Sequence, residues 1–232
     1  MSLLLHKQAA AGLPRLQPYR PPPDNGLPII FQDDGFLVVD KPAGLLSVPG
    51  RGDGLQDCVL HRVRLRYPQV LMVHRLDEAT SGLLMFALSP QIQKALSYAF
   101  ETRTVKKTYL TRVHGFPEHS SGIIDLPIAK DWPRRPLHHV NFEVGKSAIT
   151  AYKTLSKDEL LAQSLLELEP QTGRTHQLRV HLQYIGHPIV GDKLYGLPAD
   201  AAPRLMLHAR RMEFLHPMRQ DQLLTIECAT PF

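Results

Sequence analysis

The sequence predicts an α+β fold whose central sheet is mixed and mostly antiparallel, with flanking helices. Several segments have the character of strands, yet helical segments do not alternate with them as they do in a parallel α/β fold. The chain has 232 residues, 43% of them hydrophobic and 21% charged, which is enough for a substantial core and ordinary for a globular protein. No internal repeat or proline-rich linker interrupts residues 27–232, so we expect one folded domain there.

The first 26 residues are expected to form an extended tail rather than a packed domain. They hold prolines at positions 14, 18, 21, 22 and 23 and few large apolar residues after Leu5. The folded region is expected to begin at Leu27.

The first elements of the domain are a strand and a helix. Phe36–Asp40 is an apolar run that favours a strand, and Lys41–Gly44 ends it. Asp53 is a candidate N-cap for a helix over Leu55–Arg66, which Pro68 stops.

A buried strand and a second helix follow. Leu83–Leu88 is a continuous apolar run of strand length. Ser89-Pro90 is a strong helix start, because serine caps the helix and proline suits its first position. Apolar residues from Ile92 to Phe100 then recur at helical spacing.

The rest of the chain is mainly strands. Lys107–Val113 alternates in the manner of a half-buried strand. A short helix is expected from His176 to Ile185, closed by Gly186. Further strands are expected at Ser147–Leu155, Ser164–Leu168 and Leu223–Cys228.

Asp77 is the first candidate for chemistry. It stands two residues after Arg75, in a turn-forming segment that leads directly into the buried strand at Leu83. A carboxylate on such a rigid support suits a nucleophile or an acid–base group. The alternative is an ordinary Arg-Asp pair on the surface.

Composition and spacing argue against several other classes of protein. The net charge of +5 is compatible with an anionic partner such as RNA. Cys58 and Cys228 lie far apart, which favours buried thiols in a reducing compartment, and no apolar run reaches membrane-spanning length. We therefore expect a cytoplasmic protein. His176 and His181 are five residues apart, a poor spacing for two ligands on one helical face, so no metal site is expected.

Four short motifs follow one another along the chain: Lys41–Leu45 (KPAGL), His74–Gly82 (HRLDEATSG), Lys107–Tyr109 (KTY) and Thr172–His181 (TGRTHQLRVH). Gly186–Asp192 continues the last of them. Together they resemble the RluA-type pseudouridine synthases. Gly44–Arg51 and Asp131–Pro136 resemble the branch of that family that modifies both large-subunit (23S) ribosomal RNA and the tRNA anticodon stem-loop.

The resemblance implies a pseudouridine synthase fold with an active-site cleft across the sheet. It implies an isomerase that needs no cofactor, acts on RNA and has no obligate protein partner. The tail is too short for the S4-type RNA-binding module that many relatives carry, so we expect none.

The resemblance also assigns roles to residues. Asp77 would be the catalytic carboxylate, Arg179 the cation that favours its charged form, and Tyr109 the platform for the uracil. Arg75 would occupy the space left by the flipped nucleotide or hold that nucleotide. Candidate RNA contacts, each of which could equally be a solvated charge, are Arg62, Arg66, Lys107, Arg134 and Arg135.

Other readings remain open at this point. They are a sister synthase with a single rRNA or tRNA target, a non-catalytic RNA-binding protein on the same scaffold, and a nucleosidase that uses Asp77. The last usually needs two carboxylates around the scissile bond. The sequence also leaves open whether Asp77 adds to the substrate or removes a ribose proton.

Overall fold

A computed structural model of the chain describes residues 18–219 and 221–232. Within them, the helices are α1 (Val59–Arg64), α2 (Pro90–Glu101) and α3 (Gln177–Tyr184). The strands are β1 (Ile29–Gln32), β2 (Phe36–Lys41), β3 (Leu71–Met72), β4 (Ser81–Ala87), β5 (Lys106–His114), β6 (Ser121–Asp125), β7 (Ile128–Lys130), β8 (His138–Val140), β9 (Ile149–Asp158), β10 (Gln163–Pro170), β11 (Leu207–Leu215) and β12 (Leu223–Glu227).

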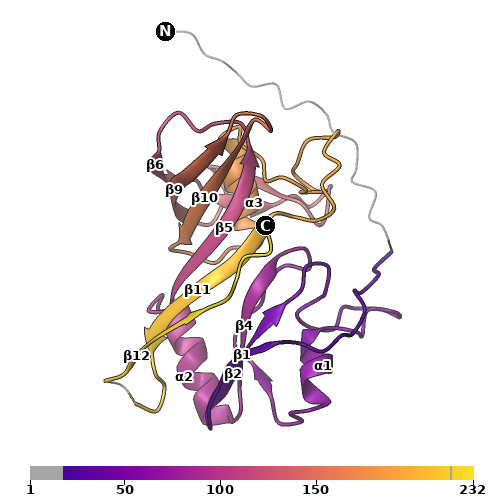
Figure 1. The fold of residues 1–232 in the computed structure, drawn as a ribbon, viewed down its shortest axis with the longest axis vertical. Coiled ribbons are helices and arrows are strands. Elements are labelled where there is room, and N and C mark those ends of the chain that lie inside the picture. Colours follow the sequence, from indigo (N-terminus) through magenta and orange to yellow (C-terminus); the bar gives the residue numbers. More distant parts are fainter. Residues whose placement is uncertain (1–17, 220) are drawn as a thin grey trace.

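Ten strands form one sheet, in the order β1-β2-β4-β11-β5-β10-β9-β6, with β12 paired to β11 and β3 paired to β4 (Figure 1). All its pairs are antiparallel except that of β4 with β11. Strands β7 and β8 make a separate hairpin. The α+β prediction is confirmed. No helix among the described residues is both long and apolar enough to cross a membrane.

Strand β4 is buried along its whole length, because helices cover both faces of this half of the sheet. Ile92 and Leu96 of α2 belong to the apolar cluster on one face, while Val59 and Val63 of α1 belong to the cluster on the other. Helix α3 packs against the other half of the sheet through a third cluster, which includes Leu178. Figure 1 shows the two halves joined through β11 and β5.

Helix α2 begins where the sequence predicts. The Ser89 hydroxyl accepts a hydrogen bond from the Ile92 amide at 3.3 Å, and Pro90 occupies the first turn. The predicted strands are also present, with ends shifted by a few residues.

Helix α1 is shorter than predicted and Asp53 does not cap it. The chain stays extended through Cys58, because Cys58 forms a parallel bridge with Leu46 and the Val59 amide donates to the Leu46 carbonyl at 2.8 Å. Cys58 is therefore the N-cap, and its sulfur accepts from the His61 amide at 3.3 Å.

Residues 18–26 are extended, as expected, and hydrogen bonds hold them against the folded domain. The Tyr19 hydroxyl donates to the Asp57 carbonyl at 2.8 Å and accepts from the Leu46 amide at 3.1 Å. The remainder of the predicted tail, residues 1–17, lies outside the described residues.

Arg62 anchors this segment, which corrects the expectation that it contacts RNA phosphates. Its side chain is only 5% exposed and binds Asp57 through two nitrogens at 2.7 and 2.8 Å. The same guanidinium donates to the carbonyls of Pro22 and Pro23 at 2.6 and 3.4 Å. All three of its nitrogens are thus occupied within the protein.

Replacing Arg62 with methionine is expected to lower the free energy of unfolding by about 1–3 kcal/mol, because several charge-assisted hydrogen bonds are lost. Urea unfolding measures this change. Arg64→Met is the matched control, since Arg64 is exposed on the same helix and should change stability by less than about 0.5 kcal/mol. Unchanged stability together with weakened RNA binding in Arg62→Met would restore the phosphate-contact role.

Candidate active site

The Asp77 loop is fixed on both sides of the carboxylate. Before it, the Ser47 hydroxyl donates to the Leu76 carbonyl at 2.7 Å and accepts from the Leu76 amide at 3.1 Å. After it, the Lys41 ammonium donates to the Glu78 carbonyl at 2.8 Å. Asp77 therefore projects from a backbone that is held at both neighbouring residues, and its side chain remains 23% exposed.

Lys41 explains why the KPAGL segment accompanies the Asp77 segment. Its side chain is fully buried, and burial lowers its pKa to about 7 although Asp77 and Glu78 oppose the shift. The Gly44 amide also donates to the Glu78 carbonyl, at 2.9 Å, from a turn with a φ of +82° that suits glycine. The first segment thus positions the second.

A cavity of about 120 Å³ opens beside Asp77. This volume is smaller than that of the pockets that hold drug-sized ligands. Five of the residues predicted from the sequence line it: Arg75, Asp77, Lys107, Tyr109 and Arg179.

Arg179 meets two carboxylates. Its Nε and Nη2 atoms donate to Asp192 at 2.8 and 2.7 Å, and its Nη1 lies 3.5 Å from Asp77 Oδ2. Burial would lower the pKa of Arg179, but the hydrogen bonds and charge of Asp192, with Asp77, outweigh burial and raise it. The closer partner of Arg179 is therefore Asp192, and the nitrogen left free points toward Asp77.

Asp192 stands in the continued motif Gly186–Asp192, to which the sequence alone assigns no role. Its side chain has no exposed area, and its Oδ1 also accepts from the amides of Leu194 and Tyr195 at 2.9 and 3.1 Å. These bonds fix the carboxylate that in turn fixes Arg179. The signal available in the sequence was the position of Asp192 in the continued motif Gly186–Asp192.

His176 also faces Asp77. Its Nε2 lies 3.8 Å from Asp77 Oδ2, and its Nδ1 lies 2.7 Å from the Tyr195 hydroxyl. Burial lowers the pKa of His176 to about 4 despite the opposing charge of Asp77, so the imidazole is neutral near pH 7. When Tyr195 donates to Nδ1, the proton on Nε2 points toward Asp77.

Tyr109 and Lys107 reach the cavity from β5. The pKa of Tyr109 is raised by burial and by the charge of Asp77, so the phenol stays protonated at neutral pH. The pKa of Lys107 is lowered by burial and by Arg103. Both side chains belong to the wall of the cavity.

The β7–β8 hairpin stands beside the cavity. The His138 amide donates to the Tyr195 hydroxyl at 2.9 Å, and the rings of His138 and His176 are 5.3 Å apart. Arg134 and Arg135 lie on this hairpin but outside the cavity wall. Arg134 binds Asp131 at 2.6 Å, and Arg135 lies over Trp132.

Arg66 lies apart from these groups, just after α1. It is exposed, and its guanidinium carbon is 5.4 Å from the centre of the Tyr67 ring.

The sheet, the loops around Asp77 and the small cavity define a known class of RNA-modifying enzyme. Residues 35–184 match the sequence profile of the RNA pseudouridylate synthase family, and the chain belongs to that family. It is therefore an RNA pseudouridine synthase, an isomerase.

Individual relatives make the likeness more specific. The dual-specificity RNA pseudouridine synthase RluA of Escherichia coli O157:H7 is 46% identical over 206 residues, covering 87% of this chain and 93% of that protein. The enzyme of the same name from Vibrio vulnificus is 47% identical, covering 86% and 82%. Among solved structures, human RNA pseudouridylate synthase domain containing 1 superposes with a TM-score of 0.77 at 29% identity, covering 92% of this chain and 87% of that one.

Proposed function

We propose that the chain converts uridine to pseudouridine in both large-subunit ribosomal RNA and the tRNA anticodon stem-loop, with Asp77 as the catalytic carboxylate. The observation that carries this proposal is the carboxylate of Asp77, held at both neighbouring residues in a small cavity with Arg179 and Tyr109. The dual substrate rests on the similarity to the RluA enzymes, whose name includes dual specificity.

The reaction breaks the bond between the ribose and N1 of uracil, turns the base and joins it through C5. Arg179 Nη1 lies 3.5 Å from Asp77 Oδ2 and places a positive charge beside the carboxylate that must act. Tyr109 offers an aromatic face for the detached base, which must remain in the cavity until the new bond forms. Addition of Asp77 to the substrate and removal of a ribose proton both use the same carboxylate.

The target uridine has to leave its stack before it reaches Asp77, at a cost of a few kcal/mol. Arg75 stands at the cavity wall with an exposed side chain. Its planar guanidinium suits stacking in the space that the base leaves, or hydrogen bonding to the flipped nucleotide.

The β7–β8 hairpin is the proposed surface for the flanking RNA. Trp132 is 62% exposed, with Lys130 Nζ 4.4 Å and the Arg135 guanidinium carbon 4.1 Å from the centre of its ring. An aromatic face between two cations provides both stacking and phosphate contacts. Arg134, Lys107 and Arg66 remain proposed RNA contacts; Arg62 does not.

Replacing Trp132 with alanine is expected to weaken RNA binding by about 1–3 kcal/mol, the range for one stacked base. The dissociation constant for a tRNA anticodon stem-loop should rise, while the single-turnover rate at saturating RNA should change less. Tyr98→Ala is the control, since Tyr98 is 67% exposed on α2. Equal RNA affinity of Trp132→Ala and the wild type would remove the hairpin from the proposed surface.

Pseudouridine mapping in cells with and without the gene tests the dual substrate. We expect one or more pseudouridines to disappear from both RNA classes, and loss from a single class would identify a sister synthase with one target.

Both cysteines are free, which agrees with the proposed cytoplasmic location.

A further inference from the structure

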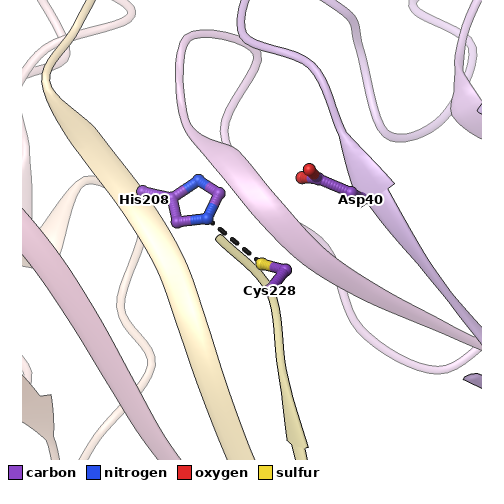
Figure 2. Close-up of side chains that lie close together, drawn as sticks. All are labelled: Asp40, His208 and Cys228. Carbon is purple, nitrogen blue, oxygen red and sulfur yellow. Dashed lines mark hydrogen bonds between the residues drawn. The ribbon is translucent and has the colours of Figure 1, made fainter. Parts of the chain in front are cut away.

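Three side chains that commonly bind transition metals meet outside the catalytic cavity. They are Asp40 on β2, His208 on β11 and Cys228 just after β12, and their ligand atoms lie within 4.8 Å of one another (Figure 2). His208 and Cys228 are buried and Asp40 is partly buried. None of the three lines the cavity at Asp77.

The backbone brings them together where β11 changes its neighbour. His208 and Ala209 pair with β4, whereas β11 from Arg211 onward pairs with β12. Cys228 lies at this change, with its amide donating to the Arg210 carbonyl at 3.0 Å. Strand β4 lies between the strands of Asp40 and His208, and in Figure 2 its ribbon passes between Asp40 and the hydrogen-bonded pair of His208 and Cys228.

The imidazole of His208 is well prepared to be a ligand. Its Nε2 lies 3.1 Å from Cys228 Sγ, and its Nδ1 lies 2.8 Å from the Ser81 hydroxyl. A proton on Nδ1, donated to Ser81, leaves the Nε2 lone pair facing the sulfur, and metal-binding histidines usually have such an oxygen partner on the second nitrogen.

We propose that Asp40, His208 and Cys228 form a binding site for a divalent transition metal of the zinc type. Sulfur, imidazole nitrogen and carboxylate oxygen are the ligands that Zn²⁺ takes in proteins, and three protein ligands leave a fourth position for water. A thiolate and a carboxylate would balance the two charges of the metal.

Metal binding at this site releases a proton. The thiolate rather than the thiol is the ligand, so Cys228 gives up its proton to solvent as the metal binds. The metal replaces that proton and the Sγ–metal bond forms. Arg204 is the competing cation, since its charge acts on both Asp40 and His208.

A metal at Cys228 would tie β2 and β11 to the C-terminal segment. Its first expected effect is therefore on stability rather than on turnover.

Titration of the full, chelator-treated chain with Co²⁺ tests the proposal. We expect a thiolate-to-cobalt charge-transfer absorption that saturates near one metal per chain and is displaced by Zn²⁺. The Cys58→Ser chain should behave identically, because its serine still caps α1. Cys228→Ser should lose the band, and Asp40→Asn should bind Co²⁺ at least ~10-fold more weakly. Arg204→Gln should bind it more tightly.

If Cys228→Ser does not fold, the change in Tm on adding Zn²⁺ to the other chains tests the proposal instead. Zn²⁺ should raise the Tm of the wild type and of Cys58→Ser, and at the same Zn²⁺ concentration it should raise that of Asp40→Asn by less. Absence of the cobalt band in the wild type, its persistence in a folded Cys228→Ser chain, or a Tm that Zn²⁺ leaves unchanged would overturn the proposal. The contact would then be a thiol–imidazole hydrogen bond only.

Discussion

Replacing Asp77 with asparagine is expected to lower the single-turnover rate of pseudouridine formation by about four orders of magnitude or more, the scale for loss of a group that reacts directly. The amide is nearly isosteric, so the loops held by Ser47 and Lys41 should keep their hydrogen bonds. RNA affinity should change little, because the proposed RNA surface on the β7–β8 hairpin is untouched. Tritium release from uridine labelled at C5 measures the rate.

Glu78→Gln is the matched control for Asp77→Asn. Glu78 is the adjacent carboxylate in the same loop, but it is not among the residues that line the cavity. Its replacement should slow turnover by less than about tenfold, well below the loss expected of a reacting group. If Glu78→Gln formed pseudouridine slowly while Asp77→Asn formed it at nearly the wild-type rate, the catalytic role would belong to Glu78.

Replacing Arg179 with methionine is expected to lower both stability and turnover. The change leaves Asp192 buried without its cation, which costs about 3–5 kcal/mol of unfolding free energy. It also removes the Nη1 atom beside Asp77, and the turnover rate should fall by about 10²–10³. Urea unfolding measures the first effect and single-turnover kinetics the second.

The double variant Arg179→Met/Asp192→Asn separates the two effects. Asparagine at position 192 can still accept the amide bonds of Leu194 and Tyr195 but no longer carries a buried charge. Stability should recover in part while turnover stays low. If the folded double variant turned over at nearly the wild-type rate, Arg179 would have no role beyond structure.

The sequence predicts the central fold because local signals agree with packing there. The apolar run that becomes β4 is buried along its length, and Ser89-Pro90 starts α2 as its residue types require. Helix α1 begins later than the predicted Leu55, because the bridge between Leu46 and Cys58, a contact between separate segments, decides where it begins. Short strands such as β7 and β8 carry too few residues for a clear alternation.

The candidate site divides in the same way. Asp77, Tyr109 and Arg179 stand in recognisable motifs, and the fold brings all three to one cavity. Asp192 acts through a buried ion pair, which residue spacing alone does not reveal. The sequence alone does not separate a buried Arg62 from a solvated one, because its partners, Asp57 and the carbonyls of Pro22 and Pro23, lie outside its own helix.

The metal-ligand cluster illustrates the limit of spacing rules most clearly. The spacing of His176 and His181 predicts no metal site. The ligands of the proposed site instead come from separate strands of the sheet and from the segment after β12. Cys228 has no cysteine or histidine at ligand spacing in the sequence. Its proximity to His208 arises only from the pairing of β11 with β12.

The most direct test of the central claim is pseudouridine mapping on purified RNA. Unmodified large-subunit ribosomal RNA and a tRNA anticodon stem-loop are incubated separately with the wild-type chain and with Asp77→Asn, and each product is sequenced for pseudouridine. We predict modification of a defined uridine in both RNAs by the wild type and in neither by the variant. Equal yields from the two chains, or no pseudouridine in either RNA with the wild type, would contradict the account.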